Sequence, residues 1–85
     1  MKAHSTDAQR TRLLERLRVR PCSTIEARHE LDIVSPAPRV YELRHRSGHN
    51  IHTYWTTALN PGGRQHRVAN YVLLSGNFGE NKNGI

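Results

Sequence analysis

Two helix-start signals lie close together in the first half of this 85-residue chain. Ser23 and Glu26 form a capping box, in which each side chain accepts the other's backbone N–H, and this predicts a helix from Thr24 onward. Ser35 before Pro36 predicts a second start, because proline at the first helical position has no N–H to leave unpaired. Only a tight turn fits between the two helices. This spacing is typical of a helix-turn-helix, whose second helix enters the major groove of DNA.

A further helix is expected before this pair. Thr6 and Gln9 have the spacing of another capping box, so the helix is expected over residues 7–18. Residues 19–22 would then break the helix and could supply a short extended segment. The apolar spacing predicts the inward side chains of these first two helices to be Leu13, Leu14, Leu17, Ile25, Ala27 and Leu31.

The helix that follows Ser35 is expected over residues 36–46 and ends at Gly48, which can adopt a positive φ. At about 100° per residue, one face carries Ala37, Val40 and Leu43, with Arg44 at its margin. The predicted outward side chains are Pro38, Arg39, Tyr41, Glu42, His45 and Arg46.

After Gly48 the apolar period changes to two, which is the period of a β-strand. Residues 49–59 are rich in β-branched and aromatic side chains, residues 60–63 form a turn signal, and residues 64–74 return as a second strand. The side chains expected to face the helices are Ile51, Trp55, Ala69, Tyr71 and Leu73. The opposite parity of Val68, Val72 and Leu74 leaves room for a bulge or a third short strand.

These elements predict an α+β fold: a winged helix-turn-helix, with three helices followed by a β-hairpin wing. The domain is expected over residues 6–74, between a flexible N-terminus (1–5) and a flexible C-terminal tail (75–85).

The charge of the chain favours a polyanionic partner. Thirteen Lys and Arg against seven Asp and Glu give a formal net charge of +6. Eleven of the thirteen cations are arginine, whose planar fork suits phosphates and guanine edges.

The ordered motifs resemble a compact winged-helix family found largely in bacteriophages and prophage-rich bacterial genomes. The motifs that carry the resemblance are Glu26-Ala27, Arg39-Val40-Tyr41-Glu42-Leu43-Arg44, Gly48-His49-Asn50-Ile51 and Arg67-Val68-Ala69-Asn70-Tyr71-Val72-Leu73. The resemblance covers residues 13–74 and implies a winged helix-turn-helix that binds DNA.

The expected function is sequence-specific binding of double-stranded DNA by a small phage or prophage regulator. Arg39 and Arg46 are the expected base readers, and Arg44 is expected to brace the helix or reach a phosphate. Arg64 and Arg67, in the hairpin 59–67, would reach the neighbouring backbone or minor groove. The full set of candidate DNA-binding residues is Ser23, Arg28, Ser35, Pro38, Arg39, Tyr41, Glu42, Arg44, His45, Arg46, Arg64 and Arg67.

Other functions have weaker signals. His45, His49 and His52 lack the spacing of a zinc site, so neither a metal nor a cofactor is expected. Cys22 has no evident catalytic partner, and a non-enzyme is expected. The aromatic side chains Tyr54, Trp55 and Tyr71 are expected to pack in the core and hairpin rather than to stack on bases.

Two alternatives stay open: an excisionase-like architectural protein that bends DNA, and a winged helix that binds protein as an adaptor. A single cysteine and the lack of a long apolar run indicate a soluble protein of the bacterial cytoplasm with no membrane partner. A second copy of the chain on the DNA is also possible.

Overall fold

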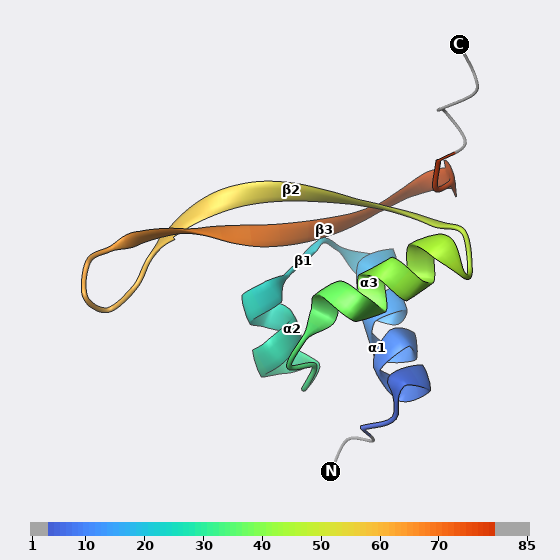
Figure 1. The fold of residues 1–85 in the computed structure, drawn as a ribbon, viewed down its shortest axis with the longest axis horizontal. Coiled ribbons are helices and arrows are strands. Elements are labelled where there is room, and N and C mark those ends of the chain that lie inside the picture. Colours follow the sequence, from blue (N-terminus) through green and yellow to red (C-terminus); the bar gives the residue numbers. More distant parts are fainter. Residues whose placement is uncertain (1–3, 80–85) are drawn as a thin grey trace.

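We describe the protein from a computed structural model, which describes residues 4–79. The chain forms three helices and a three-stranded antiparallel sheet, whose first strand lies between the first two helices in the sequence (Figure 1). Their bounds are α1 (Thr6–Val19), β1 (Cys22–Ser23), α2 (Thr24–Glu30), α3 (Pro36–His45), β2 (His49–Leu59) and β3 (Gln65–Asn77). The sheet covers one side of the helices, and the β2–β3 hairpin extends past α2 as a free arm (Figure 1). The predicted α+β winged helix-turn-helix is confirmed.

Local signals in the sequence place the helix starts. In α2 the capping box forms as predicted: Ser23 Oγ accepts from the N–H of Glu26, and Glu26 Oε1 accepts from the N–H of Ser23, both at 3.0 Å. The predicted box at the start of α1 is wrong, because Ser5 is the N-cap and its Oγ accepts from the N–H of Ala8 at 3.1 Å. Ser35 is the N-cap of α3, but its side chain makes no capping bond.

The turn between α2 and α3 combines a left-handed residue, a backbone hydrogen bond and a buried side chain. Asp32 adopts a φ of 57°, a left-handed conformation that Asp tolerates better than most residues. This reversal lets the N–H of Ile33 donate to the carbonyl of Ala27 at 3.0 Å. Since the Ile33 side chain is fully buried, the turn is part of the core and fixes how α3 leaves α2.

The core lies between the helices and the sheet. Its buried members are Leu13, Leu17, Cys22, Ala27, Ile33, Val40, Leu43, Ile51 and Tyr71, with Leu14, Leu31, Ala69 and Leu73 packed against them. Two predicted core residues of the helices are exposed instead. Ile25 points out of α2, and Ala37 is exposed in α3 because Pro36 takes the buried place.

The sheet has the order β1-β3-β2, so the short extended segment expected after α1 becomes a strand. Cys22 lies opposite Tyr71 and ties the end of α1 to the hairpin. A register shift between His49 and Ile51 supplies the irregularity that the strand parity indicated. Gly48 ends the preceding helix with a φ of 73°, as predicted.

Two further expectations need correction. Trp55 lies on the helix-facing side of β2, opposite Ala69, but it is 55% exposed because the hairpin continues beyond the helices. Residues 75–77, expected in a flexible tail, belong to β3. Residues 78 and 79 of that tail form a turn, while residues 80–85 and residues 1–3 of the expected flexible N-terminus lie outside the described residues.

The packing predicts very different costs for truncating two leucines. Leu43 is 4% exposed and Leu59 is 68% exposed. Leu43→Ala should lower the free energy of unfolding by about 2–5 kcal/mol, because a cavity remains where the side chain was. Leu59→Ala, with the same chemistry on the wing, should change it by no more than about 0.5 kcal/mol. Urea unfolding of both variants checks this, and a similar loss in both would contradict the assigned core.

Candidate nucleic-acid interface

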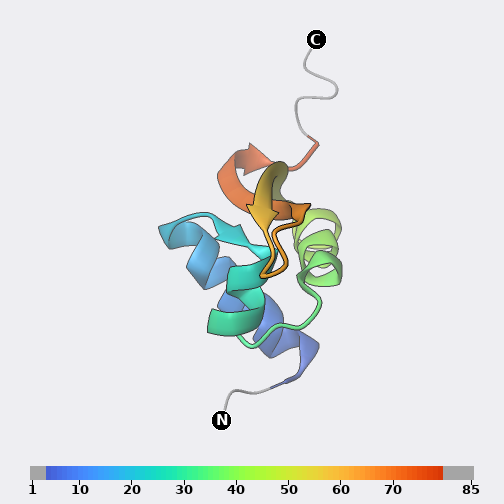
Figure 2. The ribbon, with the colours of Figure 1, turned by 90° about the vertical axis from the view of Figure 1, so that its left-hand side faces the viewer.

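Within residues 4–79, one long side of the third helix is covered by no other element (Figure 2). Tyr41 is 62% exposed there, and the centroid of its ring lies 4.3 Å from that of His45. The exposed residues on this side of α3 and at its C-cap are Ala37, Pro38, Tyr41, His45 and Arg46. Pro38, Tyr41, His45 and Arg46 are therefore outward, as predicted, and Ala37 joins them.

The predicted outward stripe of Arg39, Glu42 and Arg46 is wrong for its first two members. Glu42 Oε1 accepts from Arg10 Nη1 of α1 at 2.7 Å, and Glu42 Oε2 accepts from Arg39 Nη2 at 3.1 Å. The side chains of Arg39 and Glu42 are each only 15% exposed. They face α1 because burial of Pro36, rather than Ala37, turns this flank of the helix toward its neighbour.

Arg44 holds the end of α3 against the sheet. Its Nε donates to the carbonyl of Ile51 at 2.6 Å and its Nη2 donates to Thr53 Oγ1 at 2.7 Å. The guanidinium also lies 5.1 Å from the centroid of the Phe78 ring. Of the two roles predicted for this arginine, bracing the helix is confirmed.

The candidate DNA-binding residues Ser23, Arg28 and Ser35, at the starts of α2 and α3 and on α2 itself, differ in how free their side chains are. The Ser23 hydroxyl is engaged in the capping box, while Ser35 is exposed and makes no capping bond. Arg28 is exposed and its Nε donates to the carbonyl of Val34 at 2.9 Å. This bond fixes the guanidinium beside the turn that leads into α3.

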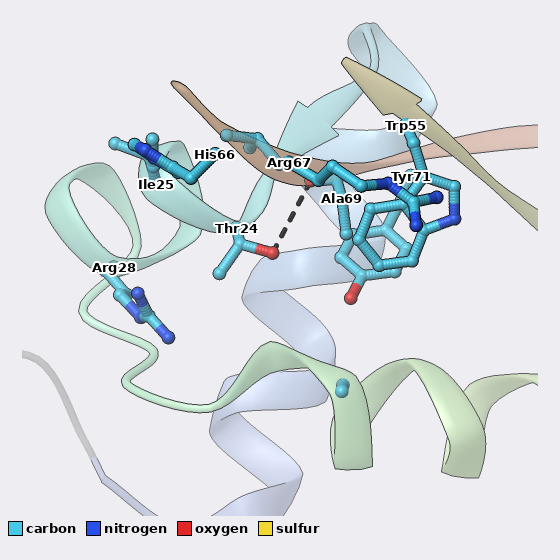
Figure 3. A pocket seen from close by; sticks show the side chains of 10 residues that line it. Thr24, Ile25, Arg28, Trp55, His66, Arg67, Ala69 and Tyr71 are labelled. Carbon is cyan, nitrogen blue, oxygen red and sulfur yellow. Dashed lines mark hydrogen bonds between the residues drawn. The ribbon is translucent and has the colours of Figure 1, made fainter. Parts of the chain in front are cut away.

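A groove of about 360 Å³ separates the helix-turn-helix from the wing (Figure 3). Arg28 lies on the helical side of this groove, and the Arg67 guanidinium lies on the strand side, 4.5 Å from the centroid of the Trp55 ring. The full lining is Thr24, Ile25, Arg28, Ala37, Trp55, His66, Arg67, Val68, Ala69 and Tyr71. Two predicted residues, Arg28 and Arg67, thus lie on opposite sides of one groove although they are far apart in sequence.

The sequence did not predict Ile25 and Trp55 as lining residues of this groove. Trp55 and Tyr54 were expected to be packed, yet both are exposed. Element lengths carried a usable signal: an 11-residue strand spans about 36 Å, whereas a 10-residue helix spans about 15 Å. Helices of this length cannot cover the whole hairpin, so side chains in its outer half must be exposed.

The tip of the wing is a closed turn with an exposed arginine. Asn60 accepts the backbone N–H of Arg64 on its Oδ1 at 3.0 Å and donates its own N–H to the Arg64 carbonyl at 2.9 Å. Gly63 has a φ of 81°, which a side chain would disfavour. The Arg64 side chain is therefore presented from a defined loop.

The described part of the chain offers few residues for a metal site, a reactive cysteine or a membrane span. Within residues 4–79, no three His, Cys, Asp or Glu side chains come together as a metal site would require. Cys22 is fully buried, and burial raises the pKa of its thiol. No helix among these residues has both the length and the apolar character needed to cross a bilayer.

The ion pair between α1 and α3 predicts a pH dependence of stability. The hydrogen bond from Arg10 holds the pKa of Glu42 below its ordinary value of 4.5. A carboxylate with a lowered folded pKa stabilises the fold above its unfolded pKa, and this contribution is lost as pH falls through the folded value. Glu42→Gln should therefore destabilise the protein at neutral pH, and its deficit against the wild type should shrink below about pH 4.5. Urea unfolding from pH 7 to pH 3 measures this difference.

Glu15→Gln is the matched control, since it removes the same charge from the exposed side of α1. Equal effects of the two substitutions at neutral pH would contradict a specific role for the Arg10–Glu42 pair.

Comparison with known proteins agrees with the geometry. A family model described as a winged helix-turn-helix domain matches residues 8–76, from the first turn of α1 to the end of β3. Searches among curated proteins and among solved structures found no match. The chain belongs to this winged helix-turn-helix family, whose fold indicates binding to double-stranded DNA.

Proposed function

We propose that this protein is a sequence-specific regulator that binds double-stranded DNA, of the kind used by phages and prophages in the bacterial cytoplasm. The uncovered side of α3 would enter the major groove, and the wing would lie along the neighbouring backbone or minor groove. The observation that carries the proposal is the exposed α3 beside a groove with an arginine on each side. That arrangement offers one surface for base edges and flanking cations for phosphates.

The distribution of ion pairs supports this orientation. Carboxylates neutralise cations around α1: Glu42 and Asp7 bind Arg10, while Glu26 and Glu30 bind Arg16. Among the described residues, none of the ion pairs includes Arg28, Arg64 or Arg67. Within the chain's formal net charge of +6, these three arginines therefore leave uncompensated positive charge on the side of the α2–α3 turn and the wing.

A protein-binding adaptor is the second candidate, and exposed apolar side chains favour it. Val34 is 74% exposed at the turn before α3. Tyr41 is 62% exposed and Trp55 is 55% exposed. Exposed apolar side chains suit a protein partner as well as DNA. Salt dependence separates these two readings, and a bending assay separates a regulator from an excisionase-like architectural factor. A second copy on the DNA would appear as a second binding step.

The first test is a titration of the protein with a DNA duplex at several salt concentrations. If about 5 phosphates are neutralised, log K should fall against log salt with a slope of about −4 to −5. A steep slope supports DNA as the partner. No binding at low salt, or an affinity that ignores salt, would overturn the proposal and favour the adaptor.

The wing should contribute affinity without reading sequence. Arg64→Ala with Arg67→Ala removes two exposed cations from the hairpin, so binding to specific and nonspecific duplexes should weaken by similar factors. The matched control is Arg18→Ala with Arg20→Ala, which removes the same charge from the end of α1, on the side away from α3 (Figure 2). A loss confined to the specific duplex would make the wing a reader of bases, and an equal loss in the control pair would mean that only net charge matters.

A further inference from the structure

The chemistry of the uncovered side of α3 narrows the kind of DNA sequence it can read, if the proposed function holds. The first turn of a recognition helix is the part that commonly contacts base edges. Here the exposed side chains of that turn are Ala37 and Pro38, followed by Tyr41 in the next turn. Ala37 and Pro38 carry neither a donor nor an acceptor in their side chains. The exposed part of the first turn is therefore apolar.

Two of the three guanidinium groups on α3 and at its C-cap are already hydrogen-bonded within the protein. Arg39 is bonded to Glu42 on the flank that faces α1. Arg44 is bonded to β2 through Ile51 and Thr53. Arg46 is exposed, but it is the C-cap residue and lies past the last turn of the helix. Reading guanine through two hydrogen bonds from an arginine would require breaking one of these arrangements or using the far end of the helix.

Tyr41 has the geometry of a pre-positioned apolar contact. Its ring packs against His45 at 4.3 Å between centroids, and His45 in turn packs against Phe78 at 5.4 Å. The Phe78 backbone N–H donates to the carbonyl of Gly48 at 3.0 Å, which ties this aromatic row to the end of α3. A side chain held in this way loses little conformational entropy when it meets a ligand.

Among the four bases, only thymine presents a methyl group in the major groove, and apolar side chains contact it. We propose that α3 recognises thymine methyl groups, with Pro38 and Tyr41 as the main specificity-determining residues, and that it does not read guanine through arginine. The proposal rests on the proposed DNA-binding function. It assigns the flanking Arg28 and Arg67 to phosphates, which are the same in every sequence.

An apolar helix face could instead receive a protein. The flanking cations favour DNA, because the groove beside α3 has a guanidinium on both its helical and its strand side. A phosphate backbone can satisfy both, whereas a protein would need acidic side chains at both places.

The test starts from duplexes selected from a random pool by the whole protein. In the selected site, each thymine is replaced by deoxyuridine, which removes only the methyl group. Each guanine is separately replaced by 7-deazaguanine, which removes the N7 acceptor, one of the two that an arginine would use. Deoxyuridine at one or more positions should weaken binding about fourfold, as expected for one methyl group that is no longer buried. The 7-deazaguanine duplexes should bind within about twofold of the parent.

Tyr41→Ala links this effect to the helix. The variant should melt like the wild type, since Tyr41 is mostly exposed, and it should no longer distinguish thymine from deoxyuridine at one of the sensitive positions. Tyr54→Ala removes another exposed tyrosine from the wing and should keep the full distinction. Pro38→Ser offers a second variant of the same surface.

The possible failures differ from one another. Binding that tolerates every deoxyuridine but is lost with 7-deazaguanine would overturn thymine reading while leaving DNA binding intact. Equal deoxyuridine sensitivity in the wild type and in the Tyr41→Ala and Pro38→Ser variants would place the methyl contact outside α3 and also overturn the assignment. Failure to bind any duplex at low salt would refute DNA binding itself, and this inference with it.

Discussion

The rotation of α3 about its own axis is the constraint on which the rest of this structure depends. Pro36, Val40 and Leu43 are buried, so one face of the helix is fixed against α1 and the sheet. The Arg10–Glu42 bond then fixes the flank beside α1. These two conditions determine which side of α3 stays uncovered. It is the side that carries Tyr41, and it includes neither of the two polar flanks. The helix-turn-helix has its reading surface because of how its other surfaces are buried.

The wing depends on a second constraint, which is the difference in length between strands and helices. The base of the hairpin is held by the pairing of Cys22 with Tyr71 and by the bonds from Arg44 to β2. Its outer half has no helix beneath it, so Trp55 and Arg67 stack on each other instead of entering the core. The groove between this outer half and α2 is a direct result. Trp55 is therefore exposed beside Arg67 because the hairpin is longer than the helices, and its ring is also available to a partner.

The sequence predicted those features that depend on residues close together in the chain. The capping box of α2, the proline start of α3, the glycine that ends it and the bounds of β2 all follow from neighbouring residues. The identity of the outward face could not be predicted in the same way. The pattern predicted burial of Ala37 rather than Pro36. The expected outward surface therefore included Arg39 and Glu42. The contact that corrects this choice joins Arg10 to Glu42, which are 32 residues apart.

In the proposed mode of binding, DNA meets the uncovered side of α3 and the groove beside it. A titration of the labelled protein with a short duplex, followed by amide NMR spectra, tests it most directly. The largest changes are expected at Ala37, Tyr41 and His45, with further changes at Arg28 and along residues 64–67, while the amides of α1 and the Arg39 side-chain signal stay in place. Changes concentrated on α1 and Arg39, with Tyr41 and His45 unaffected, would contradict this mode of binding.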